Sequence, residues 1–219
     1  MVIDLSTYRV IDLSHDMIPG EQKIDGQYLH GEPFFGRGVE VQEFMAYGAR
    51  MHFIQSQTHN GTHAEGAYKY LDEGPDMAGM PLEAFLGEAV VCDFSGKGPG
   101  EVVEPSDFEA AGVRAGDIVL VQTNPDLAGD LPYFSDAALE FLIAAPIKLL
   151  SSAGNMYYGP PPNGHTAAEQ RLFECGIPMV DALKGLEQIS RERVFFIGLP
   201  LKMQRVTASW CRAIALEER

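Results

Sequence analysis

The segment from His59 to Glu65 contains residue types that bind divalent metals in proteins. His59, His63 and Glu65 all have odd numbers, and side chains of one parity share a face where the chain is extended. Gly61 lies between the two histidines on that face and has no side chain to fill the space. Two imidazoles and a carboxylate suit Zn(II), Mn(II) or Fe(II). The spacing therefore predicts that His59, His63 and Glu65 converge on one divalent metal ion.

Two other interpretations of this segment are possible. A helix would also place His59 and His63 on one face, but the intervening Asn-Gly-Thr is a poor helix interior. An extended strand or loop is therefore the expected conformation. Without a metal, the segment would be a polar loop whose histidines are solvated or hydrogen-bonded. The region attracts cations, however, because three acidic residues follow at once, at Asp72, Glu73 and Asp76.

The composition limits the classes of partner. The chain has 219 residues, of which 46% are hydrophobic and 21% are charged, and its formal net charge is -15. The length is within the usual range for one domain, so we expect a single domain over residues 1–219. A strongly acidic surface repels phosphate backbones and anionic lipids. We therefore expect a small-molecule substrate and neither nucleic acid nor a membrane as a partner.

The sequence also gives an expected compartment. No apolar run reaches the length of about 20 residues that spans a bilayer, and the start of the chain does not have the pattern of a signal peptide. Cys92, Cys175 and Cys211 are odd in number and far apart, so they indicate neither a disulfide framework nor a zinc finger. These features predict a cytoplasmic protein.

The elements that would position the site are short. Apolar runs bounded by Gly, Pro, Asp or Asn predict strands at residues 10–14, 51–57, 88–94, 117–122, 147–150, 194–199 and 208–216. Helix-forming segments lie at residues 81–86, 106–112, 135–144 and 166–175. Two of them start at a serine cap and two of them end at glycine. This mixture predicts an α/β or α+β fold, and the strand order cannot be deduced from it.

The metal-binding segment resembles a known family motif. Residues 59–69 are similar to the cyclase-family pattern His-x-Gly-Thr-His-x-Asp-x-Pro-x-His. That family includes bacterial kynurenine formamidases and isatin hydrolases. The resemblance extends over nearly the whole chain, through residues 10–14, 80–87, 115–123, 176–183, 199–202 and 212–213.

The resemblance implies a fold, an activity and an assembly. It implies an α/β fold of the swivelling β/β/α type, with a mixed-strand sheet core and flanking helices. It also implies a hydrolase that uses Zn or Mn to cleave a small amide, lactam or lactone, and a homodimer or homotetramer. His59 and His63 match the family's metal ligands in type. Glu65 stands where the family has Asp and has one more methylene of reach.

Further positions also depart from the family pattern. Lys69 stands where the family has a histidine that often acts as acid or base. Two residues earlier, Ala67 stands where the family has a proline. Asp181 matches the family's second-site Glu, and Glu169 stands where the family has a histidine twelve residues earlier. His165 lies one helical turn before Glu169, so either Glu169 or His165 would complete the site with Asp181.

These departures change the expected mechanism. Among carboxylates Lys69 would stay charged, so it cannot be a base but can hold a substrate carboxylate or an oxyanion. The base would then be Glu65 or Glu169, with a pKa raised by burial if it does not bind metal. We therefore predict catalytic roles for Lys69 and Glu169 and an anionic or carbonyl-bearing substrate. An aromatic substrate is also possible, since tyrosines at positions 68, 70, 157 and 158 could line a pocket.

Two alternatives to hydrolysis remain open at this stage. The same scaffold could carry a metal-dependent lyase, isomerase or cyclase, in which Lys69 and a carboxylate move protons without adding water. The chain could also be a relative that binds a ligand but has lost turnover. Only hydrolysis must incorporate oxygen from the solvent. Two further histidines, His30 and His52, are expected to be structural or on the surface.

Overall fold

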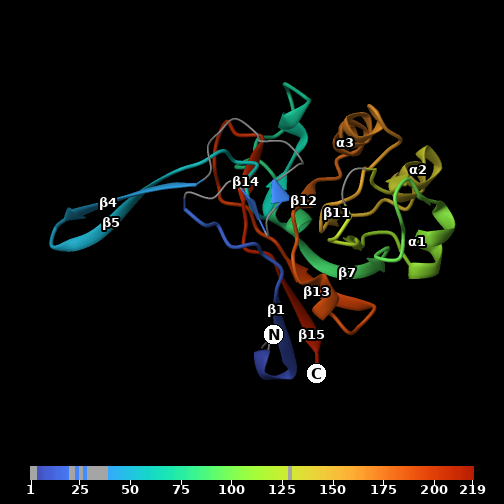
Figure 1. Cartoon of the computed structure of the whole chain (residues 1–219), viewed down its shortest axis with the longest axis horizontal. Helices are drawn as coiled ribbons and strands as arrows, with labels where there is room; N and C mark the ends of the chain where they lie inside the picture. Colours follow the sequence, from blue (N-terminus) through green and yellow to red (C-terminus); the bar gives the residue numbers. More distant parts are fainter. Residues whose placement is uncertain (1–3, 20–22, 25–26, 29–38, 128–129) are drawn as a thin grey trace.

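A nine-stranded sheet runs through the molecule (Figure 1). The computed structural model describes residues 4–19, 23–24, 27–28, 39–127 and 130–219. From one edge to the other, the sheet contains β1 (Tyr8–Asp12), β15 (Ile214–Glu218), β13 (Arg193–Ile197), β7 (Leu86–Asp93), β9 (Ile118–Gln122), β11 (Leu149–Ser152), β12 (Met179–Asp181), β6 (His63–Glu65) and β14 (Ala208–Trp210).

The sheet is mixed in direction. Its four central strands, β7, β9, β11 and β12, are parallel to one another. On one side β13, β15 and β1 pair antiparallel in turn, and on the other side β6 and β14 do so. The predicted α/β fold with a mixed-strand sheet is therefore confirmed.

Three α-helices lie together at one side of the sheet (Figure 1). They are α1 (Pro105–Ala111), α2 (Asp136–Ala144) and α3 (Gly164–Glu174). Phe108 of α1, Leu142 of α2 and Leu172 of α3 are fully buried against Val119 and Leu150 of the sheet. Among the described residues, short 3-10 helices lie at η1 (Leu5–Thr7), η3 (Ala67–Lys69), η4 (Leu82–Phe85) and η5 (Leu186–Gln188).

A second core fills the opposite face of the sheet. Ile118 and Leu120 of β9 point into it, between the residues that face the helices, because successive side chains of a strand alternate in direction. Phe196 of β13 and Ala64 of β6 belong to the same core. The central strands are thus buried on both faces, as a covered parallel sheet requires.

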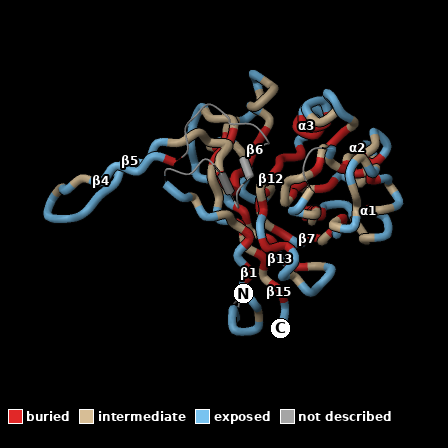
Figure 2. Tube along the Cα trace, viewed as in Figure 1, coloured by how far each residue is buried: buried red, intermediate tan, exposed pale blue. Residues whose placement is uncertain are grey.

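A hairpin projects from this body. Strands β4 (Glu40–Ala46) and β5 (Ala49–Gln55) pair along their whole length and extend away from the sheet as an arm (Figure 1). Figure 2 shows that the arm is mostly exposed. Two smaller pairs are formed by β2 (Lys23–Ile24) with β3 (Gln27–Tyr28), and by β8 (Val102–Val103) with β10 (Tyr133–Phe134).

The structure corrects several predicted elements. The single strand predicted over residues 208–216 is two strands, β14 and β15. The chain between them leaves the ladder, where the Cys211 N–H donates to Thr62 and the Ala213 carbonyl accepts from Leu13. The helix predicted at residues 81–86 is the 3-10 helix η4. The cap of α1 is Glu104 rather than Ser106, because Pro105 already occupies the first helical position.

The other predicted elements are present with shifted ends. The strand predicted at residues 51–57 is β5, which lies in the exposed arm and carries His52 on the surface. His30 lies outside the described residues. Within the described ranges, no helix is long and apolar enough to cross a membrane.

Candidate metal centre

Strand β6 and the loop before it present the segment from His59 to Glu65. The residues from His63 to Glu65 lie in the sheet between β12 and β14, while His59 lies in the preceding loop. Thr62 fixes the entry into the strand, because its hydroxyl donates to the Ala182 carbonyl at 2.6 Å and accepts from the His15 N–H at 3.0 Å. Residues 63–65 are therefore extended, as expected, whereas His59 lies in a bent loop in which Gly61 has a left-handed φ of +62°.

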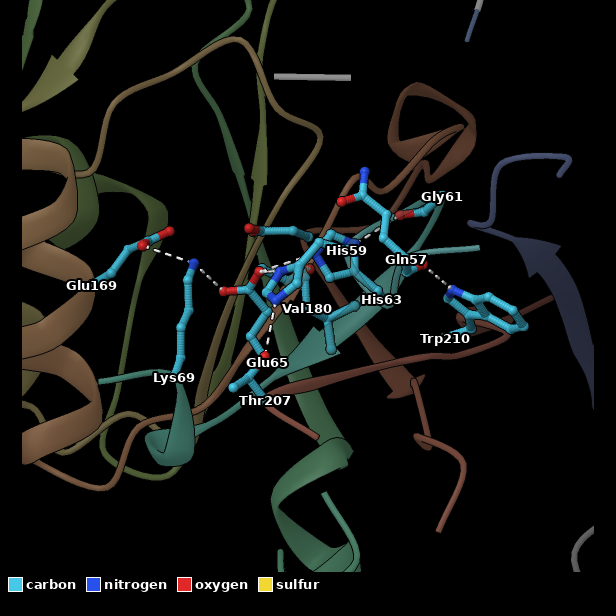
Figure 3. Close-up of polar contacts among 12 residues, drawn as sticks. Gln57, His59, Gly61, His63, Glu65, Lys69, Glu169, Val180, Thr207 and Trp210 are labelled. Atoms are coloured by element: carbon cyan, nitrogen blue, oxygen red, sulfur yellow. Dashed lines mark hydrogen bonds and ion pairs between the residues drawn. The ribbon is translucent and has the colours of Figure 1, made fainter. Parts of the chain in front are cut away.

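The side chains of His59 and His63 both contact the Glu65 carboxylate (Figure 3). Its Oε1 lies 2.5 Å from His59 Nδ1 and 3.0 Å from His63 Nε2. Glu65 and His63 are buried, and the His59 side chain is 28% exposed. One ligand atom from each of the three residues lies within 4.8 Å of the others. The structure thus brings together the three residues that the spacing singles out.

The outer nitrogens of both imidazoles have partners of their own. His63 Nδ1 donates to the Gly61 carbonyl at 2.8 Å, which leaves Nε2 to face Glu65. His59 Nε2 lies 3.1 Å from the Thr207 hydroxyl. Histidines that bind metals are oriented in this way by a bond from the other ring nitrogen. The donor set and its support therefore fit a divalent ion that binds imidazole and carboxylate.

The second oxygen of Glu65 faces a lysine. Lys69, at the end of η3, donates from Nζ to Glu65 Oε2 at 2.7 Å and to Glu169 Oε2 at 2.9 Å. Glu169 is buried on α3, and Tyr70 donates its hydroxyl to the same Glu169 oxygen at 2.6 Å. Figure 3 shows the ammonium between the two carboxylates.

Asp181 completes a second group of acidic side chains. Carboxylate oxygens of Glu65, Glu169 and Asp181 lie within 4.8 Å of one another. Asp181 is on β12, opposite His63 of β6, and accepts a hydrogen bond of 2.7 Å from the Tyr158 hydroxyl. Burial, together with the neighbouring charge of Glu65, raises the pKa of Asp181 to about 6.

The two ring nitrogens of His165 contact Glu169 and the backbone of Tyr158. His165 Nε2 lies 3.3 Å from Glu169 Oε1, and its Nδ1 accepts from the Tyr158 N–H at 3.2 Å. The ring also stacks on Tyr158, with centroids 4.9 Å apart. Glu169 rather than His165 therefore lies beside Glu65, and His165 contacts the outer side of Glu169.

The pKa values of Lys69 and Glu65 are each shifted by the charged and polar groups around them. Burial opposes the charged form of Lys69, but the charges of Glu65 and Glu169 outweigh it and raise the pKa of the ammonium. Burial likewise opposes ionised Glu65, yet hydrogen bonds from His59 and His63 hold its pKa well below the ordinary value. Lys69 is thus a cation at neutral pH, as the sequence predicts, and it is not a base.

The pKa of Glu169 is lowered, whereas the sequence predicts that burial raises it. Burial acts in that direction, but the hydrogen bond with His165 and the charge of Lys69 lower the pKa below its ordinary value. Sequence reasoning also missed Thr207, whose contact with His59 joins positions 148 residues apart. The sequence contains no spacing or composition signal that would connect those two positions.

The chain is similar to known proteins over most of its length. Residues 11–152 match the model of the family described as "Putative cyclase", which is more than half of the chain. The chain belongs to the cyclase family. It is 36% identical over 167 residues to a kynurenine formamidase of Maricaulis maris, covering 73% of this chain and 77% of that protein.

Other members of the cyclase family match over nearly their full length. A kynurenine formamidase of Erythrobacter litoralis is 27% identical over 219 residues, covering 97% of this chain and 95% of that protein. The structure of isatin hydrolase A from Labrenzia aggregata has the same fold, with a TM-score of 0.81 and 22% identity. That match covers 98% of this chain and 95% of the other.

The turn at Gly61 gives a test of how the segment is held. Its φ is +62°, and a Cβ there would lie 3.2 Å from Met17 Cγ. We expect Gly61→Ala to lower the free energy of unfolding by about 1–2 kcal/mol, because left-handed backbone is strained for residues other than glycine. Urea unfolding measures the change. Gly96→Ala is the control, since a Cβ there meets no atom within 4 Å; equal stabilities of the two variants would contradict the expectation.

Proposed function

We propose that this chain is a metal-dependent hydrolase that cleaves a small amide, lactam or lactone. A divalent ion, Zn or Mn, would be held by His59, His63 and Glu65. The observation that carries the proposal is the convergence of two oriented imidazoles on one buried carboxylate. The names of the relatives, kynurenine formamidase and isatin hydrolase, support hydrolysis over the lyase and non-catalytic alternatives.

The metal would supply Lewis acidity, which polarises the substrate carbonyl and makes water a better nucleophile. The side chains of this chain would divide the remaining work. Lys69 would hold a substrate carboxylate or the developing oxyanion, since an ammonium has three N–H donors and its contacts with Glu65 and Glu169 account for two. Charge held in a partly buried site stabilises an oxyanion more strongly than it would in water.

Glu169 would act as the base. The carboxylate is ionised at neutral pH and can accept a proton from water, but its lowered pKa makes it a weaker base than the raised pKa expected from the sequence would have done. The hydroxyl part of water would join the carbonyl carbon as the bond from carbon to nitrogen, or to the ester oxygen, breaks. The proton would pass to the leaving atom. Tyr70 and Tyr158, which contact Glu169 and Asp181, would border an aromatic substrate.

The arm formed by β4 and β5 would join copies of the chain. Its exposed apolar side chains, with Phe44 stacked on Phe53 at 4.7 Å, include Val41, Met45, Tyr47, Met51, Phe53 and Ile54. An isolated two-stranded hairpin is at best marginally stable in water. A homodimer or homotetramer that covers this arm is therefore proposed. The single domain and the cytoplasmic location stay predictions from the sequence.

Removing the metal tests the proposed activity. We expect a chelator to abolish hydrolysis of an N-formyl aromatic amine and of a cyclic aromatic lactam, and Zn²⁺ or Mn²⁺ to restore it. Reaction in ¹⁸O-labelled water, followed by mass spectrometry of the acid product, should show one labelled oxygen. His63→Ala should lose both metal and activity. Full turnover after the metal has been removed, or a product without solvent oxygen, would refute the proposal.

Lys69→Ala tests the electrostatic role of the lysine. We expect kcat/KM to fall by about 100-fold or more, the range seen when a group that stabilises an oxyanion is removed, while the metal content does not fall. Lys97→Ala is the control, because Lys97 also pairs with a carboxylate, Asp107, at 2.9 Å and has a similar exposure. A Lys69→Ala enzyme with unchanged kcat/KM would rule out this role.

The arm can be tested through the oligomeric state. Phe53 is 67% exposed, and we expect Phe53→Glu to dissociate the assembly, because a charge would be buried without a partner. Light scattering coupled to gel filtration would then give the mass of one chain, 24.0 kDa. Leu82→Glu, an exposed position on η4, should leave the assembly intact. A monomeric wild-type protein would contradict the proposed assembly.

A further inference from the structure

Two groups of potential metal ligands share Glu65 in this site. The first contains His59 and His63, and the second contains Glu169 and Asp181. We propose that the Lys69 ammonium takes the place of a cation in the second group, so that each chain holds one divalent ion, at His59, His63 and Glu65. This inference rests on the proposed function for the first group and adds the cation content of the second.

The two oxygens of the Glu65 carboxylate face different groups of residues. Oε1 faces both imidazoles, at 2.5 and 3.0 Å, and Oε2 faces Lys69 Nζ at 2.7 Å. Figure 3 shows the imidazoles and the lysine reaching Glu65 by different sides of the carboxylate. An ion bound beside the imidazoles through Oε1 leaves the contact between Oε2 and the ammonium in place.

The ammonium lies where an ion in the second group would have to bind. Nζ is 2.7 Å from Glu65 Oε2 and 2.9 Å from Glu169 Oε2. A metal that used the same two oxygens would approach each to about 2.0–2.2 Å, and both cations would then lie between the same two atoms. Repulsion between like charges at such a separation excludes the pair. Lys69 and a second ion are therefore alternatives.

Charge balance leads to the same result. The three carboxylates of Glu65, Glu169 and Asp181 carry at most three negative charges, since each contributes one. One ammonium and one divalent ion match that number. A second divalent ion would leave two uncompensated positive charges in a largely buried site, which is strongly unfavourable.

The lysine is held in place as a fixed part of the site. Its backbone N–H donates to Gly66 in the 3-10 turn of η3, and its Nζ lies 5.4 Å from the centre of the Tyr70 ring. The Lys69 side chain is 22% exposed. Tyr70 also donates to the same Glu169 oxygen that accepts from Lys69. The ammonium and its two carboxylates are thus one ordered unit.

Metal counting tests this inference without any assay of activity. The full chain would be stripped with a chelator and dialysed to equilibrium against MnCl₂, and bound Mn would be counted per chain by mass spectrometry. Mn²⁺ is the probe because it accepts both imidazole and an oxygen-only site. We expect one Mn per chain in the wild type and two in Lys69→Met, which keeps the length of the side chain but removes its charge.

Two variants serve as matched controls. Lys69→Arg keeps the positive charge and should bind one Mn. Lys97→Met removes an ammonium of similar exposure that pairs with Asp107, and it should also bind one. Adding His63→Ala to Lys69→Met should reduce two Mn to one, because the first group loses a ligand while the second keeps its carboxylates. Circular dichroism and a cooperative thermal transition would establish that each variant is folded.

The outcomes separate this inference from the proposed function. Two Mn in the wild type, or one Mn in a folded Lys69→Met variant, would overturn the inference while the metal-dependent activity stands. No Mn in the wild type would overturn the proposed function and this inference with it. If Lys69→Met does not fold, the numbers of Mn bound by the wild type and by Lys69→Arg decide. Two ions in either protein would show that a positive side chain at position 69 does not replace a second ion.

Discussion

The Glu65 carboxylate is the charge on which the site depends. A carboxylate that is 2% exposed has lost its water, and such a loss costs several kcal/mol unless charged or hydrogen-bonded partners replace it. The partners come from three places in the chain, namely the loop with His59, strand β6 with His63, and η3 with Lys69. The geometry of the site is therefore a consequence of satisfying one buried charge.

The sheet supplies the precision that this arrangement needs. On β6, His63 and Glu65 point to one side while Ala64 points into the core on the other, as strand alternation requires. Pairing with β12 sets Asp181 opposite His63, and pairing with β14 sets Trp210 on its other side. A slip of one residue would turn His63 and Glu65 into the core. The buried Ala64 and its two neighbours thus fix the same register.

The sequence predicts the local part of this site well and the distant part poorly. His59, His63 and Glu65 lie within seven residues. Alternation along β6 brings His63 and Glu65 together, and the left-handed turn at Gly61 returns His59 to them. Glu169 comes from a helix 100 residues beyond Lys69, and only the family resemblance pointed to it. Thr207 lies in the loop before β14 and has no pattern of its own. The failure at residues 208–216 has the same cause, because an apolar run does not show that its two halves pair with different strands.

The departures from the family pattern at Lys69 and Glu169 can be explained as one compensated change of charge. Where the family has a histidine at position 69 and another at position 169, this chain has an ammonium and a carboxylate that contact each other at 2.9 Å. Lysine alone would bring an added positive charge beside the proposed metal ion, and glutamate alone would add a negative charge to Glu65 and Asp181. Removing one member of a buried ion pair typically costs about 3–5 kcal/mol. Together the charges compensate, and the longer reach of Glu65 lets one carboxylate face both the imidazoles and the lysine.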